Sequence, residues 1–178
     1  MLGLPNGIVR LVMYIPEWQQ YFEQEKCLLQ AALGDFILDI QHVGSTSIPG
    51  MIAKPIIDID ITVANYETAW KCILPIERVG FEYKGDNGIP RSYYFVKGEP
   101  PQYHLHIYEA GSTPWQNQIF FRDYLIEHHE LAWDYAELKM KLAERYPEDR
   151  PGYLAGKSEF IEWVLRLARV EYKNNKSA

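Results

Sequence analysis

The sequence has little cysteine and no long apolar run. Its two cysteines, Cys27 and Cys72, lie far apart and form no CxxC pair, so they fit reduced core or near-core residues. No apolar stretch approaches the roughly 18 residues of a membrane-spanning helix, and the N-terminus shows no signal-peptide pattern. We therefore expect a soluble, cytoplasmic protein without a membrane partner.

Two signatures of nucleic-acid and nucleotide binding are also missing. The chain has 18 Lys and Arg against 24 Asp and Glu, a net charge of −6, whereas nucleic-acid-binding domains usually carry a basic excess. This balance argues against nucleic acid as the main partner but leaves room for a local basic pocket. Residues 152–158 resemble a phosphate loop, yet they lack one residue of the GxxxxGK[ST] spacing and have helical flanks, so we reject that interpretation.

With 178 residues, the chain fits a single α+β domain, residues 1–178, large enough to bury a substantial core. Periodicity predicts a small mixed sheet with helices packed on one face in about residues 9–112, and C-terminal helices packed on this core in about residues 113–172. The predicted helices begin near Pro16, Tyr66, Thr113, Glu130 and Tyr153, and Pro75 interrupts the second. The predicted strands cover residues 36–43, 57–63, 81–83, 92–96 and 105–108.

One predicted strand carries two aspartates on the same face. In residues 57–63, isoleucine and valine occupy alternate positions, and Asp58 and Asp60 lie between them. At roughly 3.3 Å per residue their Cα atoms lie about 6.6 Å apart, near enough for both carboxylates to reach one divalent cation. A solvated sheet face alternates in the same way, but aspartate is a poor strand former, and two like charges are costly unless a cation neutralises them. The pair therefore predicts a Mg²⁺ (or Mn²⁺) site at Asp58 and Asp60.

The loop before this strand has the composition of a phosphate-binding turn. Residues 42–50 run His-Val-Gly-Ser-Thr-Ser-Ile-Pro-Gly, with glycine next to hydroxyl residues. In such a loop, backbone N–H groups can meet phosphate oxygens. We predict phosphate contacts from Gly44, Ser45 and Thr46, although a loop of this composition alone is weak support. Together with the aspartates, it indicates a metal and phosphate site.

Motifs spread over most of the chain resemble the GrpB family, which is grouped with the nucleotidyltransferase-fold superfamily. They extend roughly from Val9 to Ala168 and include the 42–50 loop, Lys54-Pro-Ile-Ile-Asp58-Ile, Arg91, His104-Leu-His106-Ile, residues 121–125, Tyr135 with Lys139, and Asp149-Arg150 followed by Tyr153, Gly156 and Lys157. The resemblance implies a nucleotidyltransferase-like mixed sheet flanked by helices, with a C-terminal helical segment. It further implies that Gly44 and Ser45 hold nucleotide phosphates, and that Asp58 and Asp60 bind Mg²⁺. The implied ligand is a nucleoside triphosphate or another phosphorylated small molecule.

The resemblance to active nucleotidyltransferases is incomplete at one position. Their pattern generally has a third carboxylate on a neighbouring strand, and this chain has His106 there. His104 and His106 share a face by alternation, whereas Glu109 points to the other face. His106 fits a neutral metal ligand or a general base, but it supplies no negative charge to a Mg²⁺ site.

Six basic residues fall within or near the same motifs. As a set they fit a cleft for a triphosphate or another anion; they are Lys54, Arg91, Arg122, Lys139, Arg150 and Lys157. For each one alone, a solvated charge or an ion pair is the simpler interpretation. From this set we predict that Lys54 or Arg91 neutralises a pyrophosphate leaving group.

Three functions are open on these observations. The first is a metal-dependent nucleotidyltransferase that moves a nucleoside monophosphate to an unknown acceptor, whose proton His106 accepts. The second is a non-catalytic module that binds a nucleotide or a coenzyme A-related ligand, which the missing third acid favours. The third is a transition-metal hydrolase built on His104, His106 and Asp58. A homodimer is compatible with each of them, since exposed sheet edges pair readily.

Overall fold

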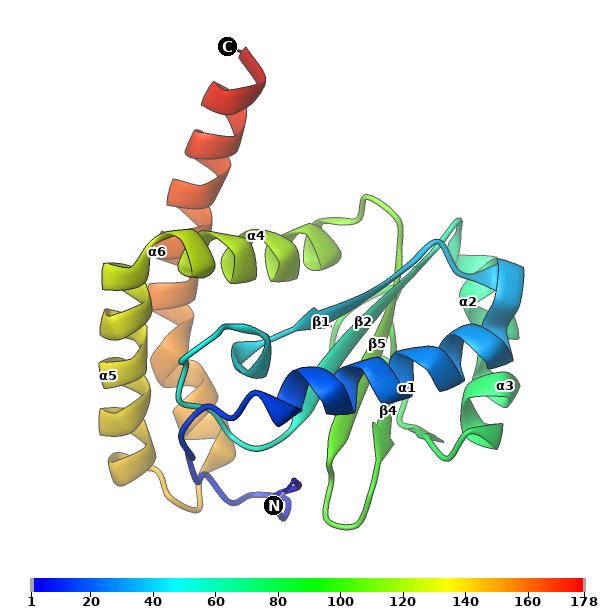
Figure 1. Cartoon of the computed structure of the whole chain (residues 1–178), viewed down its shortest axis with the longest axis horizontal. Helices are drawn as coiled ribbons and strands as arrows, with labels where there is room; N and C mark the ends of the chain where they lie inside the picture. Colours follow the sequence, from blue (N-terminus) through cyan, green and yellow to red (C-terminus); the bar gives the residue numbers. More distant parts are fainter. Residues whose placement is uncertain (1, 178) are drawn as a thin grey trace.

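A mixed five-stranded sheet forms the centre of the molecule (Figure 1). The computed structural model describes residues 2–177, with side chains through residue 175. The strands lie in the order β1-β2-β5-β4-β3, and their bounds are β1 Asp39–Val43, β2 Ile57–Val63, β3 Glu82–Tyr83, β4 Tyr93–Lys97 and β5 Tyr103–Glu109. Among these strands β2 and β5 pair parallel, and the other neighbours pair antiparallel. The predicted α+β class with a mixed sheet flanked by helices is confirmed.

Alternation along β2 and β5 gives the sheet two different faces. The three isoleucines of β2 are fully buried on one face, and the two aspartates between them therefore point to the other. The parallel register sets Asp58 beside His104 and Asp60 beside His106. Two carboxylates and two imidazoles thus share one face of the sheet.

Three helices cover the isoleucine face: α1 (Glu17–Leu33), α2 (Tyr66–Lys71) and α3 (Ile73–Arg78). Their apolar side chains join the isoleucines in one core, which includes Trp18, Phe22, Leu29 and Ile76. The predicted interruption of the second helix is confirmed. Proline cannot donate a helical hydrogen bond, and its ring collides with the carbonyl four residues earlier, which for Pro75 is the last residue of α2.

The other face lies beneath α4 (Thr113–Glu127), α5 (His129–Arg145) and α6 (Arg150–Ser177). The helices predicted within residues 9–112 lie on one face, as expected, and the C-terminal helices, for which the sequence indicated no face, cover the other. These helices form an apolar cluster largely of their own, which includes Leu125, Tyr135 and Val164, so they can stand over a polar sheet face without packing tightly into it. Within the described chain, no helix is both long and apolar enough to cross a membrane.

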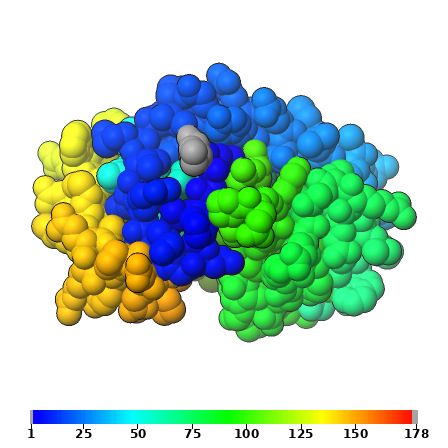
Figure 2. Space-filling view, turned by 90° about the horizontal axis from the view of Figure 1, so that it is seen from below, coloured from blue at the N-terminus to red at the C-terminus, as the bar shows by residue number. Residues whose placement is uncertain are grey.

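The segment before α1 ties the helical layer to the sheet. Gly3 N donates to Pro55 O at 2.7 Å, Val9 N donates to Pro147 O at 2.8 Å, and Val12 forms an isolated β-bridge with Ala53. Figure 2 shows this segment (blue) between the C-terminal helices (yellow to orange) and the strand loops (green). It thereby helps to fix the separation of the two layers.

Candidate functional site

A cavity of about 670 Å³ lies between the polar face of the sheet and the three C-terminal helices. Seven of the eight predicted site residues line it: Gly44, Ser45, Thr46, Lys54, Asp58, Asp60 and His106. Arg91 is not brought to this cavity. Its guanidinium donates to Glu109 Oε2 at 2.8 Å and lies over the ring of Tyr66, on the exposed surface.

Gly44 holds the loop against the carboxylate of Asp58. Its φ of +69° lies in the left-handed region, and a Cβ at this position would overlap a carboxylate oxygen of Asp58. The next residues, Ser45–Ser47, form one 3-10 turn (η2), in which Ser47 Oγ donates to Gly44 O at 2.6 Å. This turn places the Ser45 hydroxyl in the cavity near the phenol of Tyr135.

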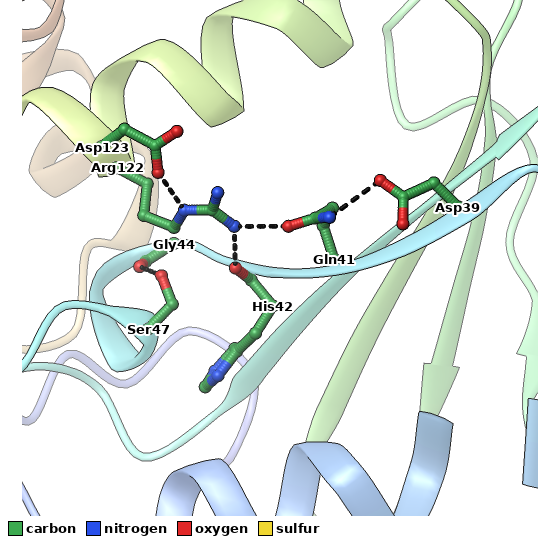
Figure 3. A network of polar contacts seen from close by, with 7 residues as sticks. All are labelled: Asp39, Gln41, His42, Gly44, Ser47, Arg122 and Asp123. Atoms are coloured by element: carbon green, nitrogen blue, oxygen red, sulfur yellow. Dashed lines mark hydrogen bonds and ion pairs between the residues drawn. The ribbon is translucent and has the colours of Figure 1, made fainter. Parts of the chain in front are cut away.

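Arg122, on α4, fixes the end of β1 just before this loop (Figure 3). Its Nη1 donates to Gln41 Oε1 and to His42 O, both at 2.8 Å, and its Nε donates to Asp123 Oδ1 at 2.7 Å. Arg122 does not line the cavity. It therefore holds the strand in the described structure, and it is not part of the basic set that lines the cavity.

The side chain of Thr46 also serves the loop. Its Oγ1 lies 3.0 Å from Nε2 of His42 and donates to Ile56 O at 3.4 Å. The His42 ring stacks on Phe22 with centroids 4.8 Å apart, and burial lowers its pKa to about 4. The Thr46 hydroxyl is thus engaged within the loop, and its predicted phosphate contact stays a prediction.

Asp58 and Asp60 differ in exposure and in partners. The side chain of Asp58 is 37% exposed, and its Oδ1 lies 3.1 Å from Nδ1 of His104. Desolvation raises the pKa of Asp58, but the hydrogen bond and charge of His104, helped by Lys54, outweigh it and hold this pKa below its ordinary value.

Asp60 is only 1% exposed, and neither of its oxygens has a hydrogen-bond partner among the described residues. Burial and the charge of Asp58 raise the pKa of Asp60 well above its ordinary value. A buried carboxyl without a partner is rare in native structures unless an ion or ligand completes it. The pair therefore fits a cation.

His106 is a second buried group without a partner. Its Nδ1 has none in the described chain, and its ring lies between Tyr94 and Tyr108, with centroids 4.7 and 5.7 Å away. Burial lowers the pKa of His106 to about 4, so the ring is neutral near pH 7. A neutral ring nitrogen can accept a hydrogen bond from a ligand.

The cavity wall carries basic side chains from one loop and two helices: Lys54, Lys139, Arg150 and Lys157. Lys139 is 1% exposed and donates to Ile52 O, and burial together with Lys157 lowers its pKa to about 6. Burial, reinforced by neighbouring cations, lowers the pKa of Lys54 and of Lys157 to about 8. Crowded, desolvated positive charges favour a polyanion in the cavity.

The donor set fits Mg²⁺ in one mode of binding. The described residues contain no group of three or more His, Cys, Asp or Glu side chains arranged to hold a metal ion. Mg²⁺ is usually bound by one or two carboxylates together with substrate phosphates, and not by an all-protein cage. Asp58 and the unpaired oxygens of Asp60 fit that mode, in which the phosphates supply the remaining ligands.

The chain is similar to known proteins over most of its length. The sequence profile described as GrpB protein matches residues 8–167. The chain belongs to the GrpB family. It is 39% identical over 175 residues to UPF0157 protein YqkA of Bacillus subtilis, covering 98% of this chain and 51% of that protein. It is 34% identical over 171 residues to glutamate-rich protein GrpB of Alkalihalophilus pseudofirmus, covering 93% and 98%. The chain thus spans about half the length of YqkA and nearly all of the second relative.

Solved structures extend the comparison to the fold. GrpB from Enterococcus faecalis matches with a TM-score of 0.85 at 34% identity, covering 92% of this chain and 99% of that one. A Cid1 poly(U) polymerase structure matches with a TM-score of 0.54 at 12% identity, covering 76% and 44%. The family assignment and the nucleotidyltransferase-like fold predicted from the motifs are both confirmed.

Several lining residues were not singled out as site residues from the sequence: Tyr94, Tyr108, Asn117, Gln118 and Tyr153. Tyr108 had a usable signal, because it lies two residues after His106 and so shares its face. No such signal existed for the side-chain amides of Asn117 and Gln118 on α4, since nothing in the sequence shows which side of that helix faces the sheet.

Proposed function

We propose that this GrpB-family protein is a metal-dependent nucleotidyltransferase, which transfers a nucleoside monophosphate from a nucleoside triphosphate to an acceptor hydroxyl. The observation that carries the proposal is that one cavity joins an aspartate pair to a wall of four basic side chains. A protein of related fold, Cid1 poly(U) polymerase, has been solved with MgGTP bound, which supports this class of ligand.

In this mechanism the carboxylates would bind the metal ion and the basic side chains would bind the phosphates. Asp58 and Asp60 would hold Mg²⁺ together with the phosphates, and the ion would neutralise charge at the phosphorus under attack. Ser45 and the backbone at Gly44 would contact phosphate oxygens. Lys54, Arg150 and Lys157 would stabilise the β- and γ-phosphates and the departing pyrophosphate.

The reaction forms one bond and breaks one. The acceptor oxygen bonds to the α-phosphorus, and the bond from that phosphorus to the bridging oxygen breaks, so that pyrophosphate leaves with the electron pair. The acceptor's proton passes to Nδ1 of His106, the buried ring nitrogen that lacks a partner in the described chain. Both substrates must therefore meet above Asp60 and His106, which are neighbours in the sheet register.

A non-catalytic binding module is the second candidate, because two observations favour it. A histidine stands where active relatives of this fold generally have a third acid, and Asp58 is already engaged by His104 at 3.1 Å. Such a module would use the same cavity and the same phosphate contacts. It would differ from the transferase only in the absence of turnover.

Calorimetric titration tests whether the cavity binds a nucleoside triphosphate together with Mg²⁺, and an assay of pyrophosphate release then separates the transferase from the module. Non-hydrolysable analogues of the four nucleoside triphosphates are added with and without Mg²⁺, to the natural protein and to Asp58→Asn/Asp60→Asn. We expect metal-dependent binding that the double substitution abolishes, and that the exposed control Asp134→Asn retains. No binding of any analogue would overturn the transferase and a nucleotide-binding module, and would leave a module that binds a coenzyme A-related ligand. Binding without pyrophosphate release from hydrolysable nucleotides and an acceptor panel would favour the module.

Two further sequence predictions are carried forward as proposals. One is a cytoplasmic location, and the other is a homodimer formed through sheet edges. The outer strands of the described sheet are β1 and β3, so a dimer of this kind would pair one of them. Sedimentation of the purified protein tests the second proposal.

A further inference from the structure

The cavity has two chemically different ends. Its four basic side chains come from the loop before β2, from α5 and from α6, as described above. The end formed by the last residues of β5 and the first turns of α4 is lined by uncharged side chains: Tyr108, Thr113, Asn117, Gln118 and Phe121. Two arginines lie nearby but do not line the cavity: Arg122 is held by the β1 contacts, and Arg169 donates to Asn117 Oδ1 at 2.5 Å.

The uncharged end also has buried polar atoms without partners. Next to the Asp60 oxygens, which are assigned above to Mg²⁺, Nδ1 of His106 and Oη of Tyr108 make no hydrogen bond of standard geometry among the described residues, and Oη lies close to the Gln118 amide. The parallel register sets Asp60 beside His106 and Thr62 beside Tyr108, so these atoms follow one another along the cavity floor. Buried polar groups are nearly always paired in native proteins, so this row points to a polar ligand.

The chemistry of the row restricts that ligand. The unpaired ring nitrogen of His106 can meet an O–H or N–H group of a ligand, and the Tyr108 phenol and Gln118 amide can each donate or accept. The rings of His106 and Tyr108 stack with an interplanar angle of 5°, and their faces suit a carbon skeleton. A phosphate or carboxylate at the Tyr108 and Gln118 side chains would find no cationic side chain in the lining of that end, which is costly.

From this juxtaposition we propose that the β5/α4 end of the cavity is the acceptor subsite, and that it takes a small alcohol or amino alcohol without an anionic group. This inference rests on the proposed transferase function, because it assigns the second substrate of the same cavity. It places the acceptor hydroxyl at His106, with the acceptor's remaining donors at Tyr108 and Gln118. A phosphorylated acceptor or a nucleic-acid strand is excluded by the same reasoning.

The test uses two probes with the same carbon skeleton, serinol and glycerol 3-phosphate. Each is titrated into the full chain, with histidine and tyrosine rings isotopically labelled, in the presence of Mg²⁺ and a non-hydrolysable triphosphate. We expect serinol to shift the NMR signals of His106 and Tyr108 and to leave Tyr103 unchanged, since Tyr103 lies in the core on the opposite face of β5. Glycerol 3-phosphate should leave the NMR signals of His106 and Tyr108 unchanged.

Tyr108→Phe provides the matched variant. It removes one hydroxyl at the cavity wall, next to the Gln118 amide. The fold should be retained, because one hydrogen bond contributes little to stability, whereas serinol binding should weaken about two- to tenfold, as for one lost hydrogen bond. Tyr103→Phe on the same strand should leave serinol binding unchanged. The inference is overturned if glycerol 3-phosphate shifts His106 and Tyr108 at lower concentration than serinol, or if serinol shifts neither. If the triphosphate fails to bind while serinol still reaches Tyr108, the transferase proposal fails and the polar subsite stands.

Discussion

The two faces of β2 carry opposite physical properties one residue apart. The isoleucine face is sealed by α1, α2 and α3, and its three isoleucines are fully buried in the main core. The aspartate face lies under α4, α5 and α6, and a cavity of about 670 Å³ separates the layers there. The period of two in a strand thus allows one segment to stabilise the fold with one set of side chains and to present chemistry with the other.

This division has an energetic consequence. Burial of apolar area is the main favourable contribution to folding, and it comes here from the isoleucine face and from the separate cluster among α4–α6. The cavity face contributes groups that are costly to bury alone, such as Asp60 and Lys139. Substitutions on the two faces should therefore separate stability from ligand binding.

The largest effect is expected from a truncation on the sealed face. Ile59→Ala should lower the free energy of unfolding by about 2–5 kcal/mol, because Ile59 is fully buried in the core. Asp60→Asn, one residue along, should leave that free energy unchanged or raise it, yet abolish triphosphate binding. Urea unfolding and calorimetry measure the two quantities. Equal destabilisation by both substitutions would contradict the division of the faces.

The glycine that joins the loop to the cavity face should have the next largest effect. In Gly44→Ala the new Cβ has to tolerate a positive φ and also overlaps Asp58. In Gly50→Ala the φ is likewise positive, at +78°, but no atom lies within 4 Å of the new Cβ. We expect Gly50→Ala to lower the free energy of unfolding by about 1–2 kcal/mol. Gly44→Ala should lower it further and should also abolish triphosphate binding. Similar values for the two variants, with binding intact in both, would count against a fixed loop.

A buried lysine should make the stability of the free protein depend on pH. The pKa of Lys139 is lowered to about 6, so above that pH the unfolded chain binds more protons, and stability rises with pH towards the ordinary lysine pKa of about 10.4. Lys139→Met removes up to one proton from the difference in protons bound by the unfolded and folded chains. The slope of stability against pH should therefore fall by up to about 1.4 kcal/mol per pH unit. Lys141→Met, an exposed neighbour on α5, should not. A slope unaffected by Lys139→Met would contradict the desolvated basic wall.

The smallest effect is expected outside the cavity. Arg91→Ala removes an exposed arginine whose partner is Glu109, and surface pairs of this kind contribute little. Triphosphate affinity should therefore be unchanged in calorimetry, whereas Lys157→Met should weaken it at least tenfold, as for a lost charged contact. A larger loss of triphosphate affinity in Arg91→Ala than in Lys157→Met would indicate that Arg91 contacts the ligand.

The sequence allowed prediction of whatever depends on short spacing. The two-residue period of β2 and the shared face of His104 and His106 are local patterns, and the structure follows them. The break at Cys72, which Pro75 causes from the first turn of α3, is likewise a local steric effect. The strand expected at 36–43 begins only at Asp39, because the chain first makes a 3-10 turn at Gly34–Phe36.

Features that depend on packing between distant segments could not be predicted from the sequence. Arg91 and Arg122 looked equivalent as basic residues, but one pairs with Glu109 and the other holds β1. The charge of Lys157 acts on Lys139 because α6 packs closely on α5 where Gly156 faces Leu142. Such long-range contacts decide which charges face the cavity, and no periodicity in the sequence encodes them.

The most direct measurement of the central claim is paramagnetic broadening by Mn²⁺ of labelled histidine signals in the NMR spectrum. Added with a non-hydrolysable triphosphate, Mn²⁺ should broaden His104 and His106 strongly and leave the exposed His129 on α5 sharp. Mn²⁺ alone should have a much weaker effect, because the phosphates complete its ligand set. Broadening of His129 alone, or no broadening in the presence of the triphosphate, would contradict a metal and phosphate site at Asp58 and Asp60.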